Sequence, residues 1–519
     1  MKKGYFVLLT LGLIIAAISL YFGLNSTWQK PVATKNQPCL NCNILLIDVD
    51  ILRADALPCY GYFRNTTPNI CQLAQKSVLF QDNYAPSNWT LPSAFSTATS
   101  IYPAFHRIEL MFVDKLSLAI PTLAETLQTA GHQTALVGSS SLPIYLTTEN
   151  GGARGFDLVT EQPIAEVIEQ LSKSKKPWFI QYYLSNLHLP YLLEADEVPI
   201  AKLEKPKNLL ATHAEFNLKF NSYLKRHATE VFQKKALQEF GSIIFAPETE
   251  NDLSLVKLLT DLFENGGNSG EYLINAWKPK YETYMESFDQ NNPSEVAYVR
   301  MLYDTKLRIS DYDLGVIFDL VANSDLAKKT ITVIMSDHGE SFGERGKFNH
   351  EPDHHTELFF TPLIINSPNI SASQIKFTTT NLDIFPTLVD LVGLVPPKGL
   401  QGISLLAPIS NGLKPTREFV FSQSNAGEII LQNRDWLYYL PVAVQTASQS
   451  GLYNKILDPQ EKLNVAEKYP ELTQSLFDQA RLLRSYDEML AAEVKNPDYL
   501  KGLKLSPEKI ERMKTEGYF

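Results

Sequence analysis

A run of apolar, mostly β-branched residues over 331–335 stops abruptly at Asp337, His338 and Gly339. The run has no alternation of apolar and polar residues, which predicts a strand buried on both faces of a sheet. In open α/β sheets, ligands bind at the carboxyl ends of such strands. An adjacent carboxylate and imidazole at that place are a suitable pair of metal ligands. The alternative is a strand that leaves the core through an ordinary polar turn.

Two other stretches have the same character. Residues 43–50 form a largely apolar run that ends at Asp50, and the apolar run 178–184 leads into a polar segment with His188. Helices with one apolar face are predicted over 120–127 and 299–321. This alternation of strands and helices predicts the α/β class, with a doubly wound and mostly parallel sheet.

Thr90 lies just ahead of a further predicted helix, and it has two interpretations. The first is a helix cap, because a threonine oxygen can accept a hydrogen bond from a free backbone N–H. The second is a nucleophile, because a helix N-terminus stabilises an alkoxide and attracts an anion. The segment taken alone favours the cap.

The chain of 519 residues is too long for one simple core. We divide it into an anchor and tether over 1–38, a catalytic domain over 39–400, and a C-terminal subdomain over 401–519 with a small sheet followed by helices. Residues 192–298 are rich in lysine, glutamate and asparagine, and we interpret them as a largely helical insertion. Such an insertion would serve either as a lid or acceptor platform or as a solvated appendage.

Residues 5–24 carry no charge and follow Lys2 and Lys3. About 20 residues, at about 1.5 Å each, cross a bilayer as a helix. No small-residue cleavage pattern closes the stretch, so a retained signal anchor is favoured over a cleaved signal peptide. The lysines place this end in the cytoplasm and the rest of the chain outside, which is the periplasm for a bacterial inner-membrane protein. The net charge of -10 argues against a nucleic-acid partner.

The four cysteines all fall in one short segment, at Cys39, Cys42, Cys59 and Cys71. Outside the cytoplasm they could form disulfides in three pairings. Zinc binding is disfavoured, because the second pair has the wrong spacing for a Cys-x-x-Cys partner. Disulfides or free structural thiols are therefore expected.

The strand-end residues and Thr90 together would form a site for ester chemistry. Asp50, Asp337 and His338 would hold one divalent ion, which would lower the pKa of the Thr90 hydroxyl. Oxygen and nitrogen ligands without thiolate favour Zn²⁺ or Mn²⁺ over Ca²⁺ or Mg²⁺. Attack on a phosphate or sulfate ester would give a covalent intermediate that water or an acceptor alcohol releases. A histidine would protonate the leaving group.

Several short segments carry a resemblance to a known family, and they occur in the order in which that family has them. They are 43–55, 59–62, 66–69, 89–93, 101–103 with His106, 188–191, 336–340 with Glu344, His350, 452–453, and 458–461 with Asn464. The chain resembles the sulfatase-like branch of the alkaline phosphatase superfamily. The resemblance implies an alkaline-phosphatase-like fold and a metal-dependent reaction on an anionic ester, such as a lipid or glycan headgroup. It assigns the metal to Asp50, Thr90, Asp337 and His338, the nucleophile to Thr90, and contacts with the ester to His188 and His350.

The departures from the family pattern bear on the chemistry. Sulfatases carry Cys or Ser where Thr90 stands, because that residue is oxidised to formylglycine, and threonine cannot give that aldehyde. Ala94 replaces an arginine of their signature, Ile51 replaces their second adjacent acid, and 139–141 replace an expected lysine and histidine. Relatives with a threonine nucleophile hydrolyse phosphate diesters or transfer phosphoethanolamine or phosphoglycerol groups.

Two hypotheses follow. The first is a membrane-anchored, metal-dependent phosphoester hydrolase or phosphotransferase that uses Thr90. The second is a degenerate member of the family that keeps the metal, or only the fold, and serves as a binding or scaffold protein. The missing basic residues motivate the second hypothesis, whereas the presence of all four metal-site residues favours the first.

Overall fold

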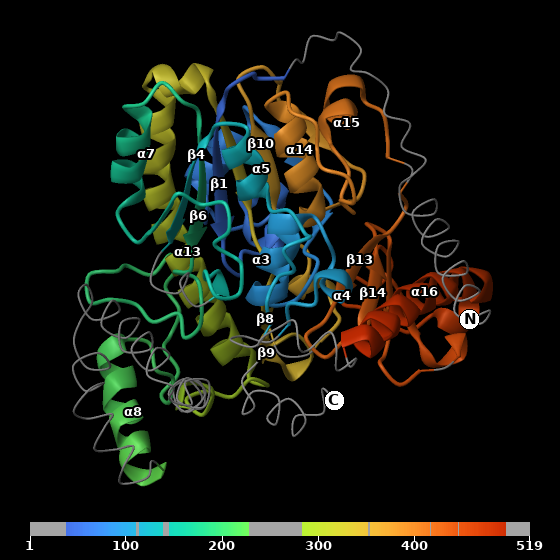
Figure 1. The fold of residues 1–519 in the computed structure, drawn as a ribbon. Coiled ribbons are helices and arrows are strands. Elements are labelled where there is room, and N and C mark those ends of the chain that lie inside the picture. The colour runs from blue at the N-terminus through green and yellow to red at the C-terminus, as the bar shows by residue number, and fades with distance from the viewer. Residues whose placement is uncertain are drawn as a thin grey trace, which may run out of the picture.

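The main sheet runs through the centre of the molecule, with helices on both of its faces (Figure 1). The computed structural model describes residues 38–109, 114–138, 145–227, 283–350, 353–415, 417–444 and 446–494. Within them, eight strands form this sheet. In sheet order they are β11 (Ser373–Ile375), β2 (Val78–Phe80), β10 (Leu363–Asn366), β7 (Thr330–Met335), β1 (Asn43–Val49), β6 (Trp178–Leu184), β4 (Gln133–Gly138) and β5 (Leu158–Thr160).

The strands from β7 to β5 are all parallel to one another, as the doubly wound prediction requires. β10 is the exception, because it runs antiparallel to both β7 and β2. The sheet is therefore mixed but mostly parallel. The three strands predicted as buried, β1, β6 and β7, lie side by side at its centre.

The register of the central strands brings two predicted ligands together. Asp48 of β1 pairs with Met335 of β7 in parallel register. Asp50 and Asp337 each lie two residues beyond that pair, so both leave the sheet at the same edge. The parallel β1–β6 pairing, which ends at Val49 and Leu184, brings the segment with His188 to that edge as well.

The described helices are α2 (Pro68–Ala74), α3 (Thr90–Thr99), α4 (Pro103–His106), α5 (Leu123–Thr129), α7 (Ile164–Ser172), α8 (His213–His227), α13 (Pro293–Ala322), α14 (Ile384–Leu391), α15 (Leu406–Asn411) and α16 (Pro470–Val494).

Both faces of β1 are covered by apolar side chains, which explains why its sequence does not alternate. On one face, Leu45, Ile47 and Val49 pack with α2, α7 and α13. On the other face, Ile44 and Leu46 pack with α5, α14 and α15.

A second, antiparallel sheet follows near the C-terminal end, beside α16 (Figure 1). Its strands are β13 (Val420–Gln423), β14 (Ile429–Gln432), β15 (Trp436–Leu440) and β16 (Gly451–Asn454). Small paired strands complete the set: β3 (Asn83–Tyr84) with β12 (Thr379–Thr380), and β8 (Ser341–Phe342) with β9 (Phe348–Asn349). The small terminal sheet followed by a helix was expected from the sequence.

Two predicted helix starts differ from the structure. The helix predicted over 120–127 begins at Leu123, because Thr122 caps it through a reciprocal hydrogen-bond pair with Glu125. The long helix predicted from residue 299 begins at Pro293, where a proline in the first turn and the Asn292 cap start it. Of the predicted insertion 192–298, α8 is described, and residues 228–282 lie outside the described part.

The predicted anchor over residues 5–24 also lies outside the described residues. Among the helices that the structure describes, none is both long and apolar enough to span a bilayer. The four cysteines form two disulfides, Cys39–Cys42 and Cys59–Cys71. This pairing is one of the three that the sequence allowed.

Candidate active site

Three predicted metal ligands meet at the carboxyl edge of the main sheet. Ligand atoms of Asp50, Asp337 and His338 all lie within 4.8 Å of one another. Nε2 of His338 is 3.7 Å from Oδ1 of Asp50 and 3.6 Å from Oδ2 of Asp337. All three side chains are almost completely buried. The neighbouring ends of β1 and β7 therefore hold two carboxylates and one imidazole around a common point.

The two carboxylates have buried oxygens that no protein group satisfies. Oδ1 of Asp337 accepts the backbone N–H groups of Ile51 (3.3 Å) and His338 (2.9 Å), but its Oδ2 has no partner. Oδ1 of Asp50 also has none. Burial raises the pKa of Asp337 to about 6, and burial together with Asp337 raises the pKa of Asp50. A buried cation would satisfy both oxygens and remove the repulsion between the two carboxylates, so the residues fit a divalent metal ion.

His338 is held in the form that a metal ligand needs. Its Nδ1 lies 2.8 Å from the carbonyl oxygen of Gly339 and donates its proton to it. The lone pair of Nε2 then faces Asp50 and Asp337. Burial lowers the pKa of His338 well below the ordinary value, so the imidazole is neutral. A backbone carbonyl that fixes the tautomer in this way is a usual partner of a ligating histidine.

Thr90 faces the same point from the first turn of α3. Its hydroxyl oxygen lies 3.2 Å from Nε2 of His338, and the side chain is buried. The capping interpretation is wrong, because Trp89 occupies the cap position and no side chain caps the helix. The threonine hydroxyl is therefore directed at the metal-binding groups. The partial positive charge of the helix N-terminus favours a developing oxyanion there.

The two histidines predicted to contact an ester line the same site. The ring of His350 is 4.7 Å from that of His338, and the ring of His188 is 5.4 Å from that of His350, measured between centroids. Burial, and to a lesser degree His350, lower the pKa of His188. The rings of His338, His350 and His188 thus lie next to one another in a row beside the threonine.

Glu340 is a buried acid whose position the sequence pattern alone does not explain. Oε2 of Glu340 accepts a hydrogen bond of 3.0 Å from the Tyr191 hydroxyl. Its Oε1 lies 3.5 Å from Nδ1 of His350, and neither of these two atoms has a hydrogen-bond partner. A small movement would close a hydrogen bond between them. Glu340 is therefore placed to orient His350, which the periodicity of the sequence could not indicate.

Arg53 connects the loops that follow β1 and β7. Its Nη1 donates to the carbonyl oxygen of Glu340 at 2.9 Å and to Glu344 at 2.7 Å, and its other nitrogens bind Asp55. The guanidinium is buried, and three of its nitrogens are engaged in these contacts. Arg53 thus stabilises the active-site loops, and it is not available to bind a substrate anion.

The comparisons with known proteins agree with this geometry. A family model described as Sulfatase matches residues 42–394, which is well over half of the chain. The chain belongs to the sulfatase family. The matched span contains β1, β7 and all of the residues described above, and members of this family are ester hydrolases of the alkaline phosphatase superfamily.

The chain is similar to several named members of the sulfatase family. It is 30% identical to mouse arylsulfatase K over 212 residues, which is 38% of each chain. It is 26% identical to the choline-sulfatase of Rhizobium meliloti over 82% of each chain. The fold is similar to that of the phosphonate monoester hydrolase of Agrobacterium radiobacter, with a TM-score of 0.60, 19% identity and coverage of 86% and 96% of the two chains.

This sulfatase-family chain departs from the family signature at positions that the structure partly describes. Ala94, at the signature arginine position, is buried among Leu91, Phe95 and other apolar residues. Ile51, at the position of the second acid, has a left-handed backbone with φ 52°, which is costly for a β-branched residue. That conformation lets its N–H reach Asp337. Residues 139–141 lie outside the described part of the structure.

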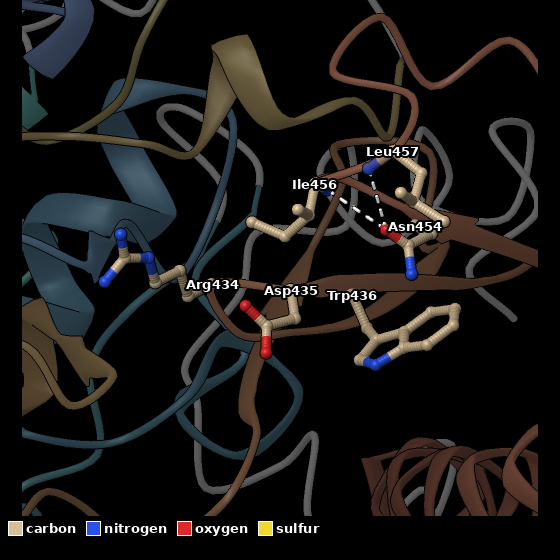
Figure 2. Close-up of a pocket in the computed structure, with 6 residues that line it drawn as sticks. All are labelled: Arg434, Asp435, Trp436, Asn454, Ile456 and Leu457. Carbon is tan, nitrogen blue, oxygen red and sulfur yellow. Dashed lines mark hydrogen bonds between the residues drawn. The ribbon is translucent and has the colours of Figure 1, made fainter.

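A shallow groove of about 640 Å³ crosses the C-terminal sheet of this sulfatase-family protein (Figure 2). It contains no residue of the predicted site. Oδ1 of Asn454 accepts hydrogen bonds from the backbone N–H groups of Ile456 and Leu457 and shapes the turn along its edge. The lining residues are Arg434, Asp435, Trp436, Asn454, Ile456 and Leu457.

Proposed function

We propose that this sulfatase-family protein hydrolyses or transfers phosphate esters through a nucleophilic Thr90. The observation that carries the proposal is the position of the threonine hydroxyl, 3.2 Å from Nε2 of His338 and beside two carboxylates with unsatisfied oxygens. A threonine with only a structural role would instead cap its helix or donate to a backbone carbonyl. Thr97, about two turns further along α3, does the latter, donating to the carbonyl of Ser93 at 3.0 Å.

The ion that fits the site is Zn²⁺ or Mn²⁺, because its ligands combine carboxylate oxygens with a neutral imidazole. Asp50, Asp337 and His338 would hold it, with Thr90 beside them. When bound, it supplies a Lewis acid that lowers the pKa of a hydroxyl and draws in an ester oxygen. The buried surroundings strengthen this effect, since little water screens the charges.

In the first half of the proposed reaction, Oγ1 of Thr90 forms a bond to phosphorus while the bond from phosphorus to the leaving oxygen breaks. The threonine proton passes to solvent, and a histidine gives a proton to the departing alkoxide. In the second half, the oxygen of water or of an acceptor alcohol forms a bond to phosphorus while the bond from phosphorus to Oγ1 of Thr90 breaks. The attacking oxygen gives its proton to the histidine, and Oγ1 takes a proton from solvent, which restores the hydroxyl. Hydrolysis and transfer differ only in the identity of this acceptor.

His350 is the preferred proton donor. Burial lowers the pKa of His188, so that ring carries little proton at neutral pH. Oε1 of Glu340 lies 3.5 Å from Nδ1 of His350 and would fix the orientation of the His350 ring. His188 would then contact the ester as a neutral hydrogen-bond partner.

Phosphate is preferred to sulfate for two reasons. Threonine cannot form the formylglycine aldehyde on which sulfatases rely. The arginine of their signature is replaced by Ala94 in an apolar cluster. Mouse arylsulfatase K and the choline-sulfatase support the family, and the phosphonate monoester hydrolase is a relative in fold that is named for action on a phosphorus ester. We propose an anionic headgroup ester of a lipid or glycan as the substrate.

We further propose that residues 5–24 anchor the chain in a membrane, with the catalytic domain outside the cytoplasm. Two disulfides in the described residues support an oxidising compartment. Fractionation of cells that make the full chain, followed by protease treatment of intact cells or spheroplasts, tests this. Recovery of the full chain in the cytosol would contradict it.

A substrate panel tests the enzymatic proposal. The purified domain from residue 39 onward, loaded with Zn²⁺ or Mn²⁺, is assayed with an aryl phosphodiester, an aryl phosphomonoester and an aryl sulfate. We expect turnover of a phosphate ester that Thr90→Ala abolishes. A metal-free protein without turnover on any ester would support the scaffold hypothesis. Sulfatase activity that survives Thr90→Ala would contradict the nucleophile.

A further inference from the structure

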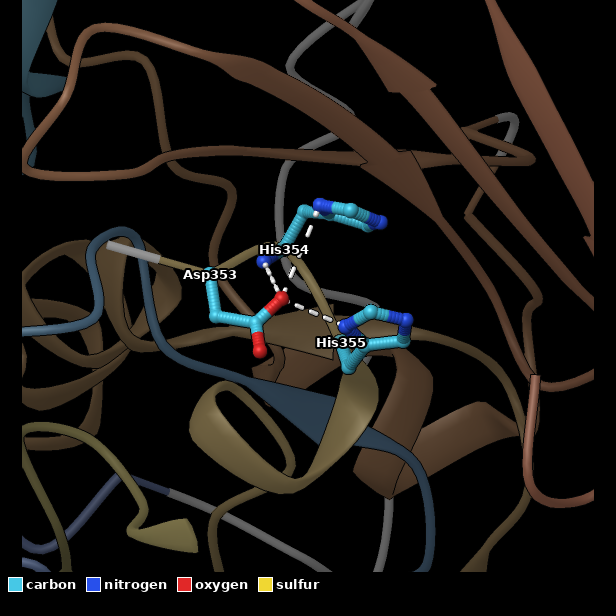
Figure 3. A group of neighbouring side chains, drawn as sticks. All are labelled: Asp353, His354 and His355. Atoms are coloured by element: carbon cyan, nitrogen blue, oxygen red, sulfur yellow. Dashed lines mark hydrogen bonds and ion pairs between the residues drawn. The ribbon is translucent and has the colours of Figure 1, made fainter. Parts of the chain in front are cut away.

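A second group of metal-type ligands lies in the loop between β9 and β10. Asp353, His354 and His355 are consecutive in sequence, and their side chains gather around one carboxylate oxygen (Figure 3). Oδ1 of Asp353 is 2.5 Å from Nδ1 of His355 and 3.6 Å from Nδ1 of His354. The structure buries His355, which is 7% exposed, and Asp353, which is 3% exposed.

The surroundings hold these rings in place. The ring of His354 stacks on that of Tyr439 from β15, with centroids 3.5 Å apart, and on that of His355, with centroids 4.1 Å apart. The backbone N–H of His354 also donates to Oδ1 of Asp353 at 2.8 Å. Nε2 of His354 is buried without a hydrogen-bond partner, whereas Oδ2 of Asp353 faces the ammonium group of Lys347, 3.2 Å away. The three side chains are thus fixed in orientation, and one of their nitrogens is unsatisfied.

We propose that Asp353, His354 and His355 bind a second divalent transition-metal ion, through Nδ1 of both histidines and the Asp353 carboxylate. Two imidazoles and one carboxylate suit Zn²⁺ and related ions. Ligands about 2.1 Å from a tetrahedral ion are about 3.4 Å apart, which is close to the 3.6 Å between Asp353 and His354. The short Asp353–His355 contact is a hydrogen bond that would open by about 1 Å as the ion replaces the shared proton.

The proposed site shares no ligand with the Asp50, Asp337 and His338 centre, but it lies close to the nucleophile segment. Nδ2 of Asn88, two residues before Thr90, is 3.4 Å from the carbonyl oxygen of Asp353. On the other side, Tyr439 belongs to the C-terminal sheet. A bound ion would therefore brace the loop at the junction between the main sheet and that sheet.

Lys347 is the competitor of a metal ion at this place. Its Nζ lies 3.2 Å from Oδ2 of Asp353, and its side chain is 48% exposed. An exposed lysine can turn into water when an ion neutralises the carboxylate. Lys347→Met removes the competing positive charge, so metal should bind this site more tightly in that variant, by about tenfold.

Metal counting on the full chain tests the proposal. The protein is stripped with chelator, dialysed against Zn²⁺ or Co²⁺, and analysed by inductively coupled plasma mass spectrometry. We expect two ions in the wild type and one in the double variant Asp353→Asn/His355→Gln. The control His213→Gln, which alters a partly buried histidine on α8 that pairs with Glu194, should keep two. One ion in the wild type that the double variant retains would overturn the proposal.

Three further measurements distinguish loss of metal from this site from loss of metal at the first site and from misfolding. Asp50→Asn should lose one ion and leave the second, so failure of the catalytic centre would not remove the ion held by Asp353. Near-native circular dichroism of the double variant establishes that it folds. For Co²⁺ bound to Asp50→Asn, we expect a visible absorption spectrum of nitrogen and oxygen ligation that His354→Gln shifts. An unshifted spectrum, or no greater metal affinity in Lys347→Met, would count against the assignment.

Discussion

The hydroxyl oxygen of Thr90 lies 3.2 Å from Nε2 of His338, although the two residues are 248 positions apart in the chain. The parallel register of β1 and β7 and the start of α3 create this proximity. It places a nucleophile of modest intrinsic reactivity where a cation and a helix N-terminus can both stabilise its anion. The predictions below follow from this arrangement.

Asp50→Asn should remove the metal and most of the activity. The amide keeps the shape of the side chain but loses the charge that Oδ1 offers to the ion. We expect a loss of about 10³-fold in kcat/KM, which corresponds to about 4 kcal/mol. Asp319→Asn, an exposed carboxylate on α13, is the matched control and should keep wild-type metal content. Equal activity in the two variants, measured at saturating Zn²⁺, would contradict the metal assignment.

Glu340→Gln should slow turnover with little effect on substrate binding. The neutral amide can still accept the Tyr191 hydrogen bond, but it is a weaker acceptor for Nδ1 of His350 and holds that ring less firmly. We expect kcat to fall about 10- to 100-fold with KM nearly unchanged. A rise in KM alone would indicate that Glu340 shapes the substrate site and does not orient the histidine.

Asp337→Asn should reveal the electrostatic strain of the metal-free site. The pKa of Asp337 is raised from 3.8 to about 6 by burial, so between these values the native state holds a proton that the unfolded state has lost. The stability contributed by this group therefore falls as pH rises from about 4 to about 6. With a chelator present, the wild type should therefore lose stability over that range, and Asp337→Asn should not lose this contribution. The free energy of unfolding of the variant minus that of the wild type should increase between these pH values and then level off.

Urea unfolding at several pH values, with and without Zn²⁺, measures this difference. The ion binds the wild type more tightly, so added Zn²⁺ should reverse the order of stability at neutral pH. A pH-independent difference in chelator would show that Asp337 titrates normally.

Much of the fold could be predicted from the sequence because its central strands are buried on both sides. The continuous apolar runs of β1, β6 and β7 indicated parallel strands, and the acids that follow β1 and β7 indicated the functional edge. The direction of β10 could not be predicted, because a run of four residues indicates a strand without showing whether that strand is parallel or antiparallel to its neighbours. The start of α13 was not predicted, because the polar residues before residue 299 lack the apolar periodicity of a helix. Asn292 and Pro293 nevertheless start the helix there.

The residues at the centre of the candidate site could be predicted from the ends of strands and the start of a helix. The residues that support them could not. Asp50, Asp337 and His338 each terminate an apolar run, and Thr90 precedes a helix. Glu340 and Tyr191 come together only through the folded loops, across 149 positions of sequence. The burial of His355 likewise depends on packing against the C-terminal sheet, which no local pattern records.

Covalent trapping tests the central claim most directly. The metal-loaded domain is mixed with an activated phosphodiester, quenched in acid during turnover and digested for peptide mass spectrometry. We predict a phosphoryl adduct on Thr90 in the wild type and in the matched control Thr97→Ala. Thr90→Ala should lack the adduct and lose at least about 10³-fold in kcat. Undiminished turnover in Thr90→Ala, with no adduct on the wild-type Thr90 peptide, would contradict the threonine nucleophile.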